Sequence, residues 1–200
     1  TTVGLIGAGH QAVTQLMGVC AVRNITVAYV YSRNPQACKI FCDEMTRVLN
    51  IQVMPVANAR QAVEAADILI TATTSSEPVL YGEWLKQGCH INAIGSNWAN
   101  KREIDLSTLQ RSYLIVTDSR DQAREEAGDL IIPANEGLFD WNRVYELSEV
   151  VSAHGPQRDS LENITLYKGL GIALEDITTA AHIYKLAREH GLGQELHILP

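Results

Sequence analysis

A glycine-rich turn near the start of the chain has the residue types and spacing of a phosphate-binding loop. The apolar run from Val3 to Ile6 leads directly into Gly7, Gly9 and Ala12, which fit the pattern G-x-G-x-x-A. In this pattern the first glycine permits a tight turn, the second lets backbone approach a pyrophosphate, and the alanine lets the next helix pack on the strand. The phosphates then lie at a helix N-terminus, where unpaired N–H groups favour negative charge. The pattern predicts a dinucleotide site; a plain strand-to-helix connection is the alternative.

The residues after the second predicted strand should decide whether the site accepts an adenosine ribose with a free 2′-hydroxyl, as in NAD, or with a 2′-phosphate, as in NADP. An NAD site of this type places Asp or Glu about 20 residues beyond the glycines, where the carboxylate accepts hydrogen bonds from the ribose hydroxyls. Here the strand ends in Ser32, Arg33 and Asn34, none of which is acidic. A planar guanidinium beside neutral donors suits the 2′-phosphate of NADP. We therefore expect NADP, with NAD as the alternative cofactor and a solvated surface arginine as the alternative role of Arg33.

Polar and glycine residues also follow the later strands. Ligands of parallel α/β sheets bind beyond the carboxyl ends of the strands, so these residues are candidates for the rest of the dinucleotide. An ordinary turn with local side-chain hydrogen bonds is the alternative for each loop. The expected cofactor-binding residues are Gly7, Gly9, His10 and Gln11 at the pyrophosphate, Ser32, Arg33 and Asn34 at the ribose phosphate, and Thr73, Thr74, Ser75, Gly95, Ser96, Lys168 and Gly169 toward the nicotinamide.

Composition narrows the class of protein. The chain has 200 residues, a hydrophobic fraction of 46% and a formal net charge of -7. This length can bury one sizeable core, and the acidic balance argues against a nucleic-acid partner, whose phosphates need a basic face.

The four cysteines form no C-x-x-C pair and no metal-ligand spacing with histidine, so we expect packing roles and no metal site. The printed residues show no signal-peptide pattern or apolar run of transmembrane length, so we expect a cytoplasmic protein without membrane contact.

Strand and helix patterns alternate along most of the chain. Strands are predicted at 3–6, 25–31, 53–56, 68–71, 90–94, 113–116 and 164–167, helices at 11–22, 35–49, 59–66, 105–110, 121–127, 141–151 and 172–190, and a turn at 133–137. Most strands are apolar throughout rather than alternating, which is typical of strands covered on both faces. We therefore predict an α/β fold over residues 1–200, a doubly wound, mostly parallel sheet of the Rossmann type with a long C-terminal helix.

Several segments, taken in order and spacing, resemble the ornithine cyclodeaminase and mu-crystallin family. They are residues 7–12, T-A-T-T-S-S-E-P-V-L at 71–80, N-A-I-G-S-N at 92–97, R-E-I-D at 102–105 and I-T-L-Y-K-G-L-G-I-A-L-E-D at 164–176. The resemblance implies an NAD(P)-binding Rossmann domain that follows an N-terminal domain for substrate binding and dimerisation. We expect that N-terminal domain to be absent from this chain, and a homodimer to form through it.

The resemblance also suggests which residues face the substrate. Cyclodeaminases and alanine dehydrogenases of the family carry an aspartate in the loop after the fifth strand, and Asn97 takes that position here. Asparagine orients a ligand by hydrogen bonds but cannot accept a proton as a carboxylate base does. Mu-crystallin-like ketimine reductases also lack the aspartate. We therefore expect NADPH-dependent reduction of a small imino acid, with Asn97 and Lys101 as candidate catalytic residues.

Two other functions remain open at this point. One is an ornithine cyclodeaminase or an alanine dehydrogenase-like enzyme, which would act on an amino acid. The other is a nucleotide-bound binding protein without catalysis.

Overall fold

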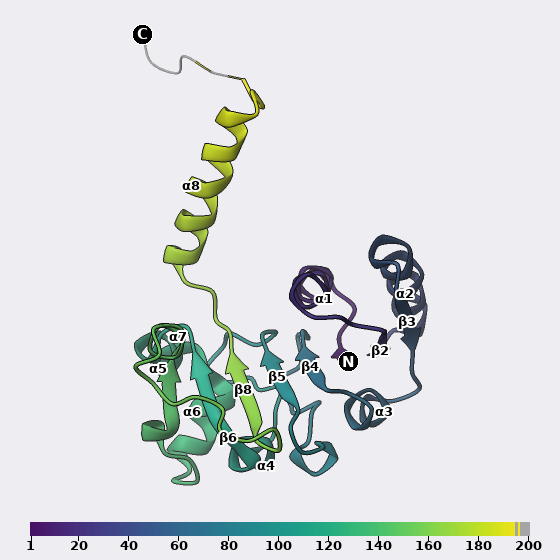
Figure 1. Cartoon of the computed structure of the whole chain (residues 1–200). Coiled ribbons are helices and arrows are strands. Elements are labelled where there is room, and N and C mark those ends of the chain that lie inside the picture. The colour runs from purple at the N-terminus through teal and green to yellow at the C-terminus, as the bar shows by residue number, and fades with distance from the viewer. Residues whose placement is uncertain (195, 197–200) are drawn as a thin grey trace. The chain divides into compact units, whose positions relative to one another are not determined.

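Eight parallel strands form one sheet in the computed structural model, which describes residues 1–194 and 196 (Figure 1). The strands are β1 (Thr2–Ile6), β2 (Val27–Tyr31), β3 (Gln52–Pro55), β4 (Ile68–Thr71), β5 (His90–Ala93), β6 (Ser112–Thr117), β7 (Val144–Glu146) and β8 (Ile164–Lys168). Their order is β3-β2-β1-β4-β5-β8-β6-β7, and every pairing between them is parallel. The predicted α/β fold is therefore confirmed.

Helices connect the strands and cover the sheet. They are α1 (His10–Val22), α2 (Pro35–Leu49), α3 (Ala59–Glu64), α4 (Leu106–Arg111), α5 (Arg120–Glu126), α6 (Gly128–Asn135) and α7 (Leu147–Val151), with single 3-10 turns η1 (Gly82–Trp84) and η2 (Trp141–Arg143). The chain first moves from β1 outward to β3 and then returns to β4 on the other side of β1. Because parallel crossovers are right-handed, this reversal puts α1 and α2 on one face and α3 on the other.

The side chains of β1 show how both faces are buried. Val3 and Leu5 belong to a core cluster with residues of α1 and α2, whereas Ile6 belongs to a second cluster that includes Val63 of α3. Alternate residues of a strand point to opposite faces, so this distribution is that of a sheet packed on both sides. The apolar runs of the sequence reflect this double burial.

Local sequence signals set where several helices begin. The side chains of Asn34, Asn58 and Asp105 each accept a hydrogen bond from the backbone N–H three residues later, and these bonds cap α2, α3 and α4. Pro35 is the first residue of α2, where its missing N–H costs nothing. The helix starts predicted at residues 35 and 59 are confirmed, and α4 begins one residue after the predicted start at 105.

Two predictions in the region after β6 are wrong. Residues 141–151 form η2, the edge strand β7 and α7 rather than one helix, and Pro133 lies inside α6 rather than in a turn. The strand β7 has three residues and exists through its pairing with β6, which a local pattern does not reveal. In α6, the proline lacks an N–H for a helical hydrogen bond, and the helix ends two residues later at Asn135.

Beyond Leu170 the described residues form a separate unit whose main element is α8 (Ala173–Glu189). This is the predicted long C-terminal helix, and Gly191, at a φ of 65°, takes the left-handed conformation expected after a helix end. None of the residues of α8 is buried. Its apolar side chains, such as Leu174 and Ile177, are exposed to solvent.

The four cysteines are free thiols, and three of them are buried. Burial raises the pKa of Cys42 to about 12 and that of Cys89 to about 11, so both thiols are neutral at physiological pH. Within the described residues there is no group of three or more His, Cys, Asp or Glu side chains arranged to hold a metal ion. The helices in the same part of the chain include none that is long and apolar enough to cross a membrane.

The central position of β8 predicts a large stability difference between two leucines near each other in sequence. Leu166 is 1% exposed and Leu161 is 89% exposed. Leu166→Ala should lower the free energy of unfolding by about 2–5 kcal/mol, because it leaves a cavity in the core. Leu161→Ala should change it by less than about 0.5 kcal/mol. Urea denaturation of both variants measures this; equal losses would contradict the burial of β8.

Candidate functional site

The carboxyl ends of the central strands are fixed side by side by hydrogen bonds just beyond each strand. Gly7 donates its N–H to Tyr31 at 2.8 Å, and Ala72 donates to Ile6 at 2.9 Å. One strand further along, Ile94 donates to the carbonyl of Thr71 at 3.0 Å. The loops after β1, β4 and β5 therefore leave the sheet from one edge, which is where ligands of such sheets bind.

The glycine turn after β1 is shaped by close backbone contact on one side and open space on the other. Gly7 has a φ of 111°, and a Cβ there would lie 2.2 Å from the carbonyl oxygen of Ala72. Gly9 is different, since a Cβ on it would meet nothing within 4 Å. It precedes α1 as the N-cap, where no side chain caps the helix and no acidic residue lies in the first turn. The first N–H groups of α1 therefore carry no side-chain partner, as an anion site requires.

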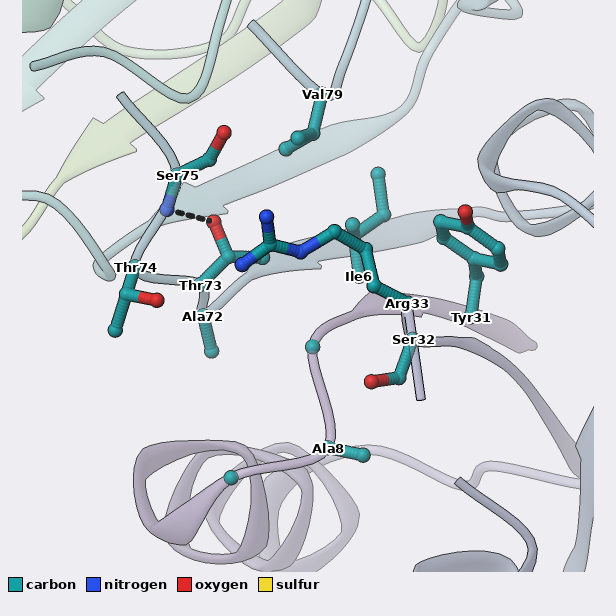
Figure 2. A pocket seen from close by; sticks show the side chains of 12 residues that line it. Ile6, Ala8, Tyr31, Ser32, Arg33, Ala72, Thr73, Thr74, Ser75 and Val79 are labelled. Carbon is teal, nitrogen blue, oxygen red and sulfur yellow. Dashed lines mark hydrogen bonds between the residues drawn. The ribbon is translucent and has the colours of Figure 1, made fainter. Parts of the chain in front are cut away.

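A groove of about 270 Å³ lies between this turn and the loop after β4 (Figure 2). Its walls come from β1 and its turn, from the end of β2, and from the loop after β4. The lining residues are Ile6, Gly7, Ala8, Gly9, Tyr31, Ser32, Arg33, Ala72, Thr73, Thr74, Ser75 and Val79. Seven of the residues predicted to bind the cofactor are thus brought together: Gly7, Gly9, Ser32, Arg33, Thr73, Thr74 and Ser75.

The side chain of Arg33 extends through the groove toward the loop after β4 (Figure 2). Arg33 is exposed, and its guanidinium has no hydrogen-bond or ion-pair partner within the described chain. The neighbouring Asn34 is used differently, because its Oδ1 accepts the N–H of Ala37 at 3.1 Å as a helix cap. Arg33 is therefore the cation available in this groove, while Asn34 begins α2.

Glu103 is a buried carboxylate that joins the loops after β4 and β5. Its Oε1 accepts the backbone N–H and the hydroxyl of Thr73, both at 2.7 Å. Its Oε2 accepts the hydroxyl of Thr71 at 3.0 Å and the backbone N–H of Gly95 at 2.7 Å. Four donors to two oxygens match the ionised form of the side chain.

The pKa of Glu103 reflects opposed effects. Burial raises it, hydrogen bonds from Thr73 lower it, the charge of Asp129 raises it and the charge of Lys168 lowers it, with a net increase above the usual value. Each carboxyl oxygen nevertheless accepts one backbone N–H, from Thr73 or from Gly95, and these two donors hydrogen-bond best to the charged form.

Lys168 lies next to this carboxylate and is fully buried. Its Nζ is 3.3 Å from Asp129 and donates to the carbonyls of Ser96 at 2.6 Å and Ala93 at 3.3 Å. The same Asp129 accepts the backbone N–H of Glu103 at 2.6 Å. Lys168, which was predicted to lie toward the nicotinamide, is thus held by buried partners and does not line the groove.

Asn97 follows Ser96 in the loop after β5. Its Nδ2 donates to the carbonyl of Leu170 at 2.7 Å, whereas its Oδ1 is buried without a hydrogen-bond partner. The hydroxyl of Ser96 is also buried and unpartnered in the described part of the chain. Lys101 lies further along, with its Nζ 5.5 Å from the ring centroid of the exposed Trp98. These residues lie in the next loop along the sheet edge and do not line the groove.

The remaining predicted cofactor residues also lie outside the groove lining. His10 and Gln11 are exposed at the start of α1, and Gly169 follows β8. Gly95 lies directly behind the loop after β4, because a Cβ on it would be 2.3 Å from the backbone nitrogen of Thr73.

Buried polar residues that were not among the predicted cofactor-binding or catalytic residues support these loops. Besides Glu103 and Asp129, Asp118 binds the backbone N–H of Leu170 at 2.6 Å and the hydroxyl of Tyr167. The R-E-I-D segment at 102–105 was visible as a motif, but nothing local indicated that its glutamate turns inward. Most of its partners, Thr71, Thr73 and Asp129, lie 26 or more positions away in the sequence, and these contacts carry that information.

A second hollow, of about 730 Å³, lies against one face of the sheet. His90 lines it and bonds Thr165 at 2.7 Å and Asn92 at 2.9 Å, and burial lowers its pKa. This hollow lies beside the strands rather than beyond their carboxyl ends. We therefore take the groove at the glycine turn as the candidate site.

The fold and the glycine-turn groove are those of a Rossmann-type α/β domain. Residues 1–191 match the family model described as ornithine cyclodeaminase/mu-crystallin family. The chain belongs to this family.

Individual relatives give the same result. A solved structure of Thermococcus litoralis Δ1-pyrroline-2-carboxylate reductase, in complex with NADH and L-proline, is 44% identical, with a TM-score of 0.94 over 98% of this chain and 61% of that one. A Δ1-pyrroline-2-carboxylate reductase of Bacillus cereus is 35% identical over 98% of this chain and 60% of its own. An alanine dehydrogenase of Archaeoglobus fulgidus is 30% identical over 96% of this chain and 59% of its own. The chain thus spans about three fifths of the length of these relatives.

The contrast between the two glycines of the turn predicts different effects of alanine. Gly7→Ala should lower the free energy of unfolding by more than about 2 kcal/mol, because the left-handed φ and the carbonyl of Ala72 both exclude a Cβ. Gly9→Ala should cost about 1 kcal/mol or less, the preference of an N-cap for glycine over alanine. Thermal and urea unfolding compare them; a Gly9 variant as unstable as the Gly7 variant would contradict the open space at Gly9.

Proposed function

We propose that this chain binds NAD(P)H and serves a reductase that converts the C=N bond of a small cyclic imino acid to an amine. The observation that carries the proposal is the groove formed by the open Gly9 turn, the uncapped N-terminus of α1 and the unpaired guanidinium of Arg33. Two relatives named as pyrroline-carboxylate reductases favour an imino acid substrate over other acceptors of hydride.

The groove fits the chemistry of a dinucleotide. Open space at Gly9 admits backbone contact with a pyrophosphate, and free N–H groups at the start of α1 stabilise its charge. Thr73, Thr74 and Ser75 form the opposite wall. The hydroxyls of Thr73 and Ser75 donate to Glu103 and to the carbonyl of Glu77, so the hydroxyl of Thr74 is the one on this wall that we assign to the cofactor. A reduced nicotinamide held in this groove would supply the hydride that reduction of a C=N bond requires, and water would supply the accompanying proton.

Asn97 favours reduction over deamination. Its Nδ2 is held by the carbonyl of Leu170, which leaves the buried Oδ1 as an acceptor that orients a ligand N–H. An amide cannot take up a proton in the way that a carboxylate base does. We assign Asn97, and with it Lys101 of the same loop, to the substrate side of the site.

The full-length gene product should oxidise NADPH or NADH when 1-pyrroline-2-carboxylate is added, with proline as the product. Loss of the absorbance of the reduced cofactor and amino acid analysis measure this. Release of ammonia from ornithine without imine reduction would favour a cyclodeaminase, and cofactor-dependent deamination of alanine would favour an alanine dehydrogenase. Cofactor binding without turnover of any of these substrates would favour a binding protein.

We further propose a preference for NADPH, based on the free guanidinium of Arg33 and the absence of an acid beside it. Arg33→Asp should weaken NADPH binding by roughly tenfold or more and move the preference toward NADH, because it replaces a phosphate-binding cation with an acceptor for ribose hydroxyls. Isothermal titration with both cofactors measures the ratio of dissociation constants.

Arg47→Asp is the matched control, since it makes the same charge change at an exposed position at the end of α2. It should leave the ratio unchanged. If wild-type protein binds NADH as tightly as NADPH, or if Arg33→Asp leaves NADPH affinity intact, the assignment of Arg33 to the 2′-phosphate is wrong. The Thermococcus litoralis relative was solved with NADH, which makes this measurement decisive for the present chain.

A further inference from the structure

The buried carboxylate of Glu103 does not line the groove, but it holds one of its walls. Of the lining residues, Thr73 binds Glu103 through both its backbone N–H and its hydroxyl, each at 2.7 Å. The hydroxyl of Thr73 in turn accepts the backbone N–H of Ser75 at 3.1 Å (Figure 2). The polar wall opposite the glycine turn is therefore held by hydrogen bonds that begin at the carboxylate of Glu103.

The other oxygen of Glu103 fixes this wall to the next loop along the sheet edge. It accepts the backbone N–H of Gly95 at 2.7 Å and the hydroxyl of the fully buried Thr71 at 3.0 Å. A Cβ on Gly95 would lie 2.6 Å from Oε1 of Glu103, so only glycine lets the loop approach so closely. One side chain thus sets the spacing between the loops that follow β4 and β5.

Glu103 is itself held in place from behind. Its backbone N–H donates to Asp129 at 2.6 Å, and that aspartate is paired with the buried Lys168 at 3.3 Å. The carboxylate of Glu103 is fully buried, so solvent does not compete for its hydrogen bonds. A buried charge of this kind persists because all its donors are supplied by the protein.

We infer that Glu103 is a positioning residue for the bound dinucleotide, which acts by holding the loop that carries Thr73 and Ser75 at its distance from the glycine turn. This rests on the proposed cofactor site. Glu103 does not line the groove, and its negative charge alone would repel an anionic cofactor. If only charge mattered, neutralising Glu103 would strengthen cofactor binding. A positioning role predicts that neutralising it weakens cofactor binding.

The substitution Glu103→Gln separates these two effects. Its amide group would replace one oxygen, so its N–H donors would face either the backbone N–H of Thr73 or that of Gly95, and neither backbone donor can rotate away. One of the two loops is then released. Binding of NADPH and NADH to the chain should weaken by roughly tenfold, although the protein has lost a negative charge. Affinity equal to or tighter than that of wild type would overturn the inference.

Two further measurements test whether weaker cofactor binding in Glu103→Gln comes from a general loss of stability. Met45→Ala removes a side chain of α2 that is 1% exposed, and this variant should lose stability while keeping its cofactor affinity. In the ligand-free protein, hydrogen exchange of the Thr73 or Gly95 amide should accelerate in Glu103→Gln but not in Met45→Ala. Equal loss of affinity in both variants, or unchanged exchange at both amides, would overturn the inference.

A second variant decides the question if Glu103→Gln does not fold. Thr71→Val keeps the shape of a fully buried side chain and removes one donor to Glu103. It should weaken cofactor binding by about twofold to fivefold, and unchanged affinity would overturn the inference. If the wild-type chain binds neither cofactor, the proposed function itself fails, and the role of Glu103 fails with it. If the wild-type chain binds cofactor and the variants bind it equally well, the inference about Glu103 is wrong and the proposed function stands.

Discussion

The buried ammonium group of Lys168 is the constraint on which the carboxyl edge of the sheet depends. A lysine without any exposed surface must find its partners inside the protein, because an unpaired buried charge costs several kcal/mol. Here the partners are Asp129 and the carbonyls of Ala93 and Ser96, which belong to three different segments. The end of β8 therefore cannot shift without breaking contacts with α6 and with the end of β5. The positions of the loops that form the groove depend on these fixed strand ends.

Local sequence signals predicted the elements that they control directly. The spacing of Gly7, Gly9 and Ala12 indicated the turn, and the helices predicted to begin at residues 35 and 59 do begin there. Each of these features depends on contacts within a few residues or on the conformational preference of one residue. The order of the strands, by contrast, followed only in outline from the alternation of elements.

The features that escaped prediction depend on contacts between distant residues. Strand β7 becomes a strand because β6 offers it an unpaired edge, and Glu103 becomes a structural carboxylate because Thr73 and Gly95 present donors to it. The sequence around Glu103 looks like any short polar segment. Asp129 follows a charged stretch of sequence at residues 120–126, yet it is 1% exposed and paired with Lys168. Burial of charge is decided by the whole fold, so local composition does not reveal it.

The place of β8 in the sheet has a consequence for how the chain acquires its structure. This strand is the last of the described strands along the chain, yet it lies between β5 and β6. Until residues 164–168 have been synthesised, β6 and β7 have no strand that joins them to the remainder of the sheet, and the edges of β5 and β6 lie open. Open edges pair readily with other chains, and pairings between segments distant in sequence form slowly. A nascent chain that had formed β1 to β7 before β8 emerged would therefore expose two half-sheets with unpaired strand edges, and a chaperone would matter most in that period.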